Sequence, residues 1–285
     1  MQIITTIQEM REIALKAKHK GSVGYVPTMG ALHEGHGSLI KKAREENNTV
    51  IVSVFVNPLQ FGPGEDYEAY PRDIEADGAF CESLGVDYIF HPEVEEMYPD
   101  DFGFRVVPPE HMTHILCGIT RPIHFAGVST VLAKFFTILR PTRAYFGQKD
   151  VQQVAIVKAM VEDLNLNLKI VPCPIVREED GLAKSSRNTY LSEEERKAAT
   201  VLSRALRYAL DSVKSGNTDA EKVKREVIEL IEKEPLAKID YVEILRFSNF
   251  ERVKRIEEDC FMAMAVYIGN TRLIDNSFFD DTDVL

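Results

Sequence analysis

The segment 50–56, with the sequence VIVSVFV, is the feature of this chain that most limits its possible folds. It is apolar on both faces of an extended backbone, with only Ser53 polar. Such a strand needs apolar cover on both sides, which is typical of a parallel sheet between two layers of helices. The segment therefore predicts a central strand of an α/β sheet.

Short β-branched segments alternate with segments of helical period between Ser22 and about Val176. The expected strands cover residues 23–27, 50–56, 88–90, 144–146 and 169–176. The expected helices cover residues 7–18, 36–46, 73–84, 128–139 and 151–164. This alternation predicts βαβ units with right-handed crossovers, which build a doubly wound, Rossmann-like α/β sheet. Ligands bind beyond the carboxyl ends of such strands, so the loops that follow the strands matter most.

The composition changes after Tyr190. Ser192, followed three residues later by Glu195, is a capping-box pattern and predicts one long charged helix that ends near Lys214. A second helix is expected after Thr218, and residues 239–245 and 260–267 have strand patterns. We therefore expect a Rossmann-like domain over 1–176 and a smaller C-terminal α+β lid domain over 177–285. The acidic tail, 280–285, is expected to fray.

Charge and composition exclude several classes of function. The chain has 285 residues and a net charge of −11, which disfavours nucleic acid and anionic membranes as partners. No apolar stretch is long enough to span a membrane, and no basic and apolar leader is present, so a cytoplasmic location is expected. The four scattered cysteines have no metal-ligand spacing and are expected to be reduced thiols: Cys81, Cys117, Cys173 and Cys260.

The loop after the first of these strands carries two histidines at the start of a helix. His33 and His36 are three residues apart, which places both imidazoles on one side of the first turn. Free backbone N–H groups and the positive end of the helix dipole lie beside them and suit a polyphosphate. The alternative is a pair of surface histidines near a Gly-rich turn. A zinc protease pattern is excluded, because H-E-G-H is one residue shorter than H-E-x-x-H.

Three further loops carry polar groups. Gly147 permits close backbone approach and Lys149 offers a charge for phosphate, although an ordinary solvated turn is the alternative. The segment 184–188 is a hydroxyl-rich connector between the two expected domains, which suits closure over pyrophosphate; a plain hinge is the alternative. Asn57 and Gln60 end the central strand with neutral amides that suit a small polar substrate, unless they only cap a turn.

Together these segments resemble the pantoate–β-alanine ligases, also called pantothenate synthetases, over nearly the whole chain. The matching segments are PTMGALHEGH, FVNPLQFGPGEDYEAYPRD, RPIHFAGV, YFGQKDVQQ and GLAKSSRNTYLS. The resemblance implies the fold of nucleotidyltransferases with a His-x-Gly-His signature, ATP and Mg²⁺ as cofactors, and a homodimer. It also implies two steps, in which D-pantoate attacks the α-phosphorus of ATP and the β-alanine amine then displaces AMP from the pantoyl adenylate.

The resemblance assigns ATP to three segments. The implied ATP-binding residues are Met29, Gly30, Ala31, Leu32, His33, Glu34, Gly35, His36, Gly147, Gln148, Lys149, Asp150, Val176, Lys184, Ser185, Ser186 and Arg187. The implied catalytic residues among them are His33, His36, Lys149, Ser185, Ser186 and Arg187. His36 resembles a proton donor, Asp150 would reach the ribose, and Val176 would contact adenine through its backbone. Because imidazole normally titrates between about pH 5 and 8, we expect the ionisation of His36 in that range.

Pantoate would be held by Gln60 and Gln153 through its hydroxyls, and Gln60 would also meet β-alanine. Four residues would surround its gem-dimethyl group: Asn57, Val128, Val131 and Leu132. Asp77 resembles a metal-associated carboxylate, with a solvated acidic helix face as the alternative.

Two positions depart from the family pattern. Gly37 stands where relatives have an apolar residue, and glycine within a helix costs about 1 kcal/mol relative to alanine, so we expect a looser turn at His36. Lys184 stands where relatives have Met or Leu, and we expect it to face the phosphates. Two other functions stay open: a plain adenylyltransferase, and a non-catalytic nucleotide-sensing or RNA-binding protein, although the acidic charge argues against RNA.

Overall fold

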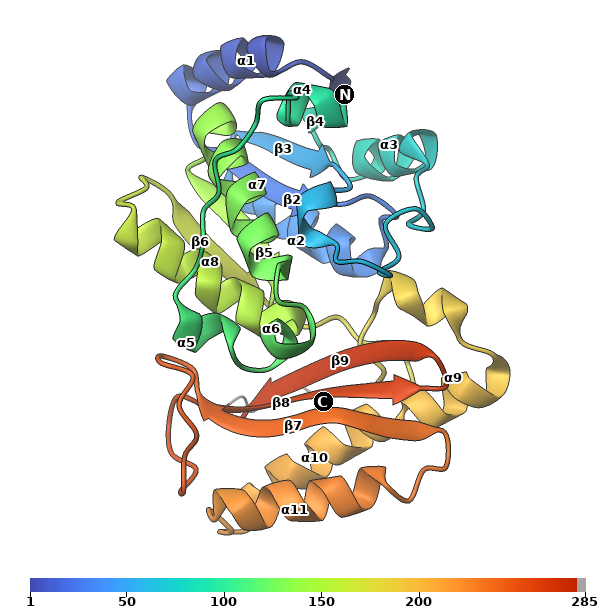
Figure 1. The fold of residues 1–285 in the computed structure, drawn as a ribbon. Coiled ribbons are helices and arrows are strands. Elements are labelled where there is room, and N and C mark those ends of the chain that lie inside the picture. The colour runs from blue at the N-terminus through green and yellow to red at the C-terminus, as the bar shows by residue number, and fades with distance from the viewer. Residues whose placement is uncertain (281–285) are drawn as a thin grey trace.

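The computed structural model describes residues 1–280, and most of the acidic tail lies outside the described residues. These residues form a six-stranded sheet with helices around it and, below it in Figure 1, a three-stranded sheet backed by helices. None of the helices in residues 1–280 is both long and apolar enough to cross a membrane. The predicted fold class, a parallel α/β sheet followed by a smaller α+β part, is confirmed.

The larger sheet is parallel throughout, in the order β1-β4-β3-β2-β5-β6. Its strands are β1 Gln2–Ile4, β2 Val23–Thr28, β3 Thr49–Val54, β4 Tyr88–Phe90, β5 Arg143–Gly147 and β6 Lys169–Cys173. The segment VIVSVFV supplies most of β3, which is one of the two central strands. The short edge strand β1 was not predicted.

Helices cover both faces of this sheet, as the two apolar faces of β3 require. Helices α1 Ile7–Lys20, α7 His124–Leu139 and α8 Val151–Asp163 bury Tyr25 and Ile51 on one face. Helices α2 Glu34–Glu46 and α3 Ile74–Ser83 bury the neighbouring Val26 and Val52 on the other. The alternation of these side chains along β2 and β3 builds the two core layers. Shorter elements complete this part: η1 Pro58–Gln60, α4 Val94–Met97, α5 Glu110–Thr113, α6 Cys117–Thr120 and η2 Gln148–Asp150.

The C-terminal part is an antiparallel sheet in the order β7-β8-β9, packed on helices α10 and α11. Its elements are η3 Ser186–Tyr190, α9 Glu193–Ala199, α10 Val201–Lys214, α11 Ala220–Ile231, β7 Ala237–Arg246, β8 Cys260–Ile268 and β9 Thr271–Phe278. The prediction of one long helix to Lys214 was wrong. Thr200 ends α9 and begins α10, and its hydroxyl donates to the carbonyl of Lys197 at 2.8 Å. The Ser192–Glu195 capping box is present as predicted.

The two parts meet through shared apolar side chains. Phe125 and Ile156 from the larger part pack in one cluster with Leu245 and Phe261 from the smaller one. Strand β9 lies beside η2 at the start of α8, where two hydrogen bonds join them. The C-terminal sheet is thereby placed next to a loop that the sequence assigned to the site.

Candidate functional site

A cavity of about 250 Å³ lies at the carboxyl ends of β2, β3, β5 and β6. Most of the residues predicted from sequence line it: Met29, His33, Gly35, His36, Asn57, Gln60, Val128, Val131, Leu132, Gly147, Lys149, Asp150, Gln153, Val176, Lys184, Ser185, Ser186 and Arg187. The predicted residues that are not on its wall are Gly30, Ala31, Leu32, Glu34, Gln148 and Asp77. Segments far apart in sequence therefore converge on one site.

The two histidines form an unusual capping box at the start of α2. His33 is the N-cap, and its Nδ1 accepts the backbone N–H of Gly35 at 3.1 Å. His36 is the third helical residue, and its Nδ1 accepts the backbone N–H of His33 at 3.3 Å. A ring nitrogen that accepts carries no proton, so each neutral ring bears its proton on Nε2. The helix cap thus leaves two Nε2–H donors on the cavity wall.

The electrostatic surroundings keep His36 neutral. Burial, the neighbouring His33 and the charge of Lys149 lower the pKa of His36 to about 3. Burial and the charges of Lys149 and Lys184 also lower the pKa of His33. The expected ionisation of His36 between about pH 5 and 8 is therefore corrected. A neutral Nε2–H still donates a hydrogen bond to a phosphate oxygen, so the assigned donor role is compatible with this shift.

Two glycines explain the spacing of this motif. A Cβ atom on Gly35 would lie 2.8 Å from Cε1 of His33, so glycine is needed for the His33 ring to cap the helix. A Cβ atom on Gly37 would lie 3.0 Å from Cζ of Phe80, because α2 packs closely on α3 there. Gly37 is buried and the turn is held by both histidine caps. The expected loosening of this turn is not what the structure shows.

Asp77 anchors the loop that precedes the histidines. Its side chain is buried, and its two carboxyl oxygens accept the backbone N–H groups of Ala31 at 3.1 Å and Leu32 at 2.8 Å. Gly30, at φ +90°, passes so close that a Cβ atom would lie 2.8 Å from Oδ2 of Asp77. Burial raises the pKa of Asp77, and these backbone bonds oppose the rise. Both oxygens of Asp77 hold this loop, so the structure gives Asp77 a positioning role, and its expected association with a metal stays a prediction.

The amides at the end of β3 form a fixed relay. The hydroxyl of Tyr98 donates to Oδ1 of Asn57 at 2.8 Å, and Nδ2 of Asn57 donates to Oε1 of Gln60 at 3.0 Å and to the carbonyl of Gly127. Asn57 thus has no polar hydrogen left for a substrate. Gln60 is oriented with its NH₂ group toward Met29 and the cavity. Of the two amides, Gln60 is the one placed to bind a substrate acceptor.

Arg121 and His124 are among the polar residues on the cavity wall that sequence reasoning missed. Arg121 pairs with Glu65 at 2.6 Å and donates to Nε2 of His124, while Nδ1 of His124 contacts the carbonyl of Gln60 at 3.1 Å. Burial and the charge of Arg121 lower the pKa of His124 to about 4. His124 was missed because α7 begins at His124 rather than at Val128, and Arg121 lies just before that helix. The segment RPIH was the signal that could have found them.

The charged side chains of the cavity wall differ in whether another side chain already pairs with them. Within residues 1–280, the side chains of Lys149 and Asp150 have no hydrogen-bond or ion-pair partner, so both are free to bind a ligand. Lys184, on the cavity wall, pairs with Glu34, and Arg187 lies 3.3 Å from Asp66. The carbonyl of Val176 accepts the backbone N–H of Lys184 at 2.9 Å, which joins the expected adenine contact to the connector.

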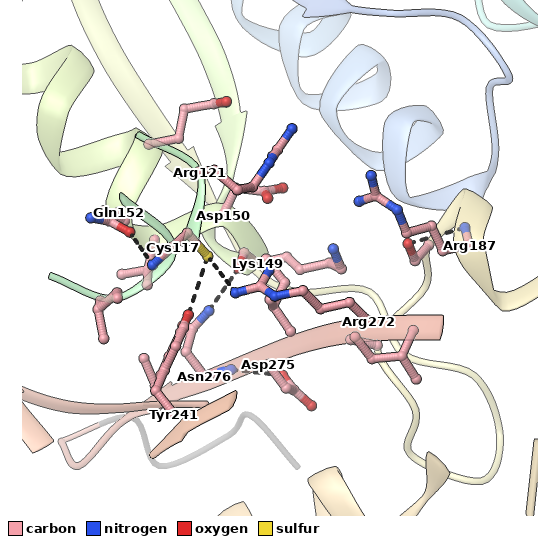
Figure 2. Close-up of a pocket in the computed structure, with 18 of the residues that line it drawn as sticks. Cys117, Arg121, Lys149, Asp150, Gln152, Arg187, Tyr241, Arg272, Asp275 and Asn276 are labelled. Carbon is pink, nitrogen blue, oxygen red and sulfur yellow. Dashed lines mark hydrogen bonds between the residues drawn. The ribbon is translucent and has the colours of Figure 1, made fainter. Parts of the chain in front are cut away.

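A second cavity of about 60 Å³ lies between the two sheets and shares part of its wall with the first, including Arg121, Lys149, Asp150 and Arg187. Figure 2 shows its far wall, where Tyr241 and Arg272 from the C-terminal sheet approach Cys117. Cys117 is half-buried, and all four cysteines are free thiols, as predicted. Through this cavity the C-terminal sheet faces the residues expected to bind phosphate.

Comparison with known proteins now identifies the family. The sequence model described as Pantoate-beta-alanine ligase matches residues 2–278. The chain belongs to the pantoate–β-alanine ligase family. A pantothenate synthetase of Clostridium botulinum (strain Loch Maree / Type A3) is 56% identical over 280 residues, which cover 98% of this chain and 99% of that protein.

Solved structures of the pantoate–β-alanine ligase family have the same fold. Pantothenate synthetase from Thermus thermophilus superposes with a TM-score of 0.93 at 44% identity, covering 98% of this chain and 99% of that one. The ligase from Francisella tularensis, solved with β-γ ATP and β-alanine, superposes with a TM-score of 0.81 at 36% identity and covers 99% and 98%. The resemblance drawn from the sequence motifs is therefore confirmed.

Proposed function

We propose that this chain condenses D-pantoate with β-alanine in an ATP-dependent reaction that releases AMP and pyrophosphate. One observation carries this proposal: a single cavity joins two neutral histidine donors and a free lysine to an apolar end that contains the oriented amide of Gln60. The two histidines and the lysine suit a triphosphate. The apolar end with the Gln60 amide suits a small branched hydroxy acid. The ATP and β-alanine bound to the Francisella relative support this assignment.

The proposed first step is adenylate formation. A carboxylate oxygen of pantoate attacks the α-phosphorus of ATP, and the bond to the β-phosphate oxygen breaks to release pyrophosphate. Negative charge develops on the phosphate oxygens, where Nε2–H of His36, Nε2–H of His33 and the ammonium of Lys149 would stabilise it. Ser185, Ser186 and Arg187 would cover the leaving pyrophosphate from the connector. Asp150 is proposed to reach the ribose, and Val176 the adenine.

The proposed second step is amide formation. The neutral β-alanine amine attacks the acyl carbon of the adenylate, the bond between that carbon and the AMP oxygen breaks to release AMP, and the proton that the nitrogen loses passes to solvent. Gln60 and Gln153 would hold the hydroxyls of pantoate, with Asn57, Val128, Val131 and Leu132 packed around its gem-dimethyl group. Each of these side chains lies on the wall of the one cavity.

Mg²⁺ is the expected companion of ATP in this family. Within residues 1–280 no group of three or more His, Cys, Asp or Glu side chains is arranged to hold a metal ion, and Asp77 is already committed to backbone N–H groups. A protein-built metal cage does not fit these residues. Mg²⁺ is often bound mainly by the phosphates of its nucleotide, which is the arrangement we propose.

The experiment measures AMP release with ATP, D-pantoate and β-alanine, omitting each in turn. The proposed ligase needs all three for AMP release, and it exchanges pyrophosphate with ATP when only D-pantoate is added. Adenylate transfer to an alcohol or phosphate would identify a plain adenylyltransferase instead. ATP binding without any turnover would identify a nucleotide sensor. Either of these two results would overturn the proposal.

We also infer the organisation of the working enzyme. Separate sheets and separate apolar cores support the division into a domain over 1–176 and a lid domain over 177–285. Four strongly exposed apolar side chains, Phe104, Val107, Ile119 and Ile123, support a homodimer, which light scattering would test. The use of ATP supports a cytoplasmic location.

A further inference from the structure

We propose that Asn276, on strand β9 of the C-terminal sheet, is a positioning residue for Lys149 in adenylate formation. The inference deepens the proposed function and rests on it. None of the expected ATP or pantoate contacts comes from the C-terminal sheet, so this assigns the sheet a part in the reaction itself. Asn276 acts on the substrate only through Lys149.

The contact is specific and buried. Nδ2 of Asn276 donates to the carbonyl of Gln148 and to the carbonyl of Lys149, each at 2.9 Å. Asn276 is only 2% exposed, so water does not replace these bonds. In Figure 2 the Asn276 side chain reaches up from β9 to the backbone beside Lys149. One amide thereby uses both of its hydrogens on two consecutive carbonyls.

These two carbonyls lie in η2, just before helix α8 begins at Val151. Asp150, the N-cap of α8, forms no side-chain cap that could stiffen this turn. The Lys149 ammonium stands on a flexible four-carbon stem, so its reach depends on where the backbone holds its Cα atom. A misplacement of about 1 Å can cost roughly a hundredfold in rate. The Asn276 bridge is the contact that fixes that backbone.

The neighbouring Asp275 ties the same strand to the connector. Its carboxylate pairs with Arg177 at 2.7 and 3.1 Å and also accepts the backbone N–H of Asn276 at 2.9 Å. Arg177 in turn donates to the carbonyl of Gly181 and is bridged to Ala183, directly before Lys184. Strand β9 therefore holds both the Lys149 turn and the base of the connector. It sets the spacing of Lys149 from the expected pyrophosphate-binding hydroxyls.

The test is Asn276→Asp, which keeps the size of the side chain and replaces the donor with an oxygen that the two carbonyls repel. We expect the kcat of pantoate-dependent pyrophosphate exchange to fall roughly 10- to 100-fold, with the KM for D-pantoate changed less than about twofold. The matched control is Ser277→Ala, which removes the next buried polar group on β9 and should leave kcat within about twofold. Asn276→Ser keeps one hydrogen-bond donor and should lower kcat by an intermediate factor. This variant replaces Asn276→Asp in the test if the aspartate variant does not fold.

A double-mutant cycle separates positioning from general stability. If Asn276 acts through Lys149, adding Asn276→Asp or Asn276→Ser to Lys149→Ala should lower single-turnover adenylate formation less than about twofold further. A full additive loss in the Lys149→Ala background, or an unchanged kcat in the single variants, would overturn the inference. If the wild-type protein shows no pantoate-dependent pyrophosphate exchange, the proposed function itself is wrong.

Discussion

The backbone N–H of His33 donates to Nδ1 of His36, 3.3 Å away, so the bond that caps helix α2 also decides which nitrogen of the His36 imidazole carries its proton. Burial lowers the pKa of this imidazole, and the neighbouring His33 and the charge of Lys149 lower it further. The site thus offers phosphate a neutral donor and leaves the positive charge to Lys149.

The first prediction concerns pH. Because the pKa of His36 is lowered to about 3, the rate of adenylate formation should show no loss from His36 protonation between about pH 5 and 8. His36→Ala should lower kcat by about 10²- to 10³-fold, the range for loss of one oxyanion donor. His36→Gln, whose amide lies near the Nε2 position, should retain more of the rate. An acid limb with a midpoint near pH 6.5 that disappears in His36→Gln would contradict this account.

The second prediction concerns the loop anchor. Asp77→Asn replaces one acceptor oxygen with an NH₂ group that faces the N–H of Ala31 or Leu32, so one buried N–H loses its partner. We expect a loss of about 1–3 kcal/mol in the free energy of unfolding, and a several-fold higher KM for ATP as the loop loosens. The control is Asp73→Asn at the N-cap of the same helix, where asparagine caps equally well. Equal effects of the two variants would show that Asp77 has no special hold on the loop.

The third prediction concerns Lys184, which pairs with Glu34. If Lys184 turns to phosphate when ATP binds, Lys184→Met should raise the KM for ATP several-fold and weaken its dependence on salt. Glu34→Gln leaves the cation in place and should not raise the KM. A matching rise in both variants would mean that the ion pair itself, rather than the lysine charge, supports binding.

Much of the fold and site could be predicted because the signals are local. The two-faced apolar segment that became β3 and the polar loops after successive strands follow from residue type and spacing alone, and parallel strands bring such loops to one edge. Strand β9 was missed because its buried residues Asp275, Asn276 and Ser277 are polar, and their partners are distant in sequence. The period of an apolar face cannot reveal such a strand.

Tertiary contacts also decide what the sequence leaves open at two other positions. Gly37 looked like a weak point in a helix, yet its small size admits the Phe80 ring. Asn57 lies on the cavity wall, and Tyr98 and Gln60 use its polar atoms. The identity of a partner across the fold decides whether a polar group is free. Sequence spacing places a residue at the site but does not show what already binds it.

The fourth prediction concerns stability in acid. The pKa of His124 is lowered to about 4 from an ordinary value of 6.5, so the unfolded chain binds this proton before the folded one does. Its contribution is fully present above about pH 6.5 and is lost as the pH falls toward 4, at about 1.4 kcal/mol per pH unit. His124→Asn keeps a donor for the carbonyl of Gln60 and cannot titrate. Between pH 6.5 and 4.5, the free energy of urea unfolding should fall less steeply with pH in His124→Asn than in the wild type. Equal slopes in the two proteins would refute the lowered pKa of His124.

The last prediction concerns the relay from Tyr98 to Gln60. Tyr98→Phe removes the hydroxyl that donates to Oδ1 of Asn57, although that oxygen still accepts the backbone N–H of Leu59 at 3.3 Å. We therefore expect only about 1 kcal/mol of lost stability, the usual value of one hydrogen bond. Because Asn57 then turns more freely, the orientation of Gln60 is less fixed, and the KM for D-pantoate should rise about five- to tenfold while the KM for ATP stays unchanged.

Tyr67→Phe provides the control for this variant. The ring centroids of Tyr67 and Phe61 lie 5.3 Å apart, and Phe61 directly follows Gln60 in the chain. Within residues 1–280, the hydroxyl of Tyr67 has no hydrogen-bond partner. Its loss should leave both KM values unchanged. If Tyr98→Phe also leaves the KM for D-pantoate unchanged, the hydroxyl of Tyr98 is not needed to orient Gln60. The hydrogen bond between Asn57 and Gln60 is then sufficient.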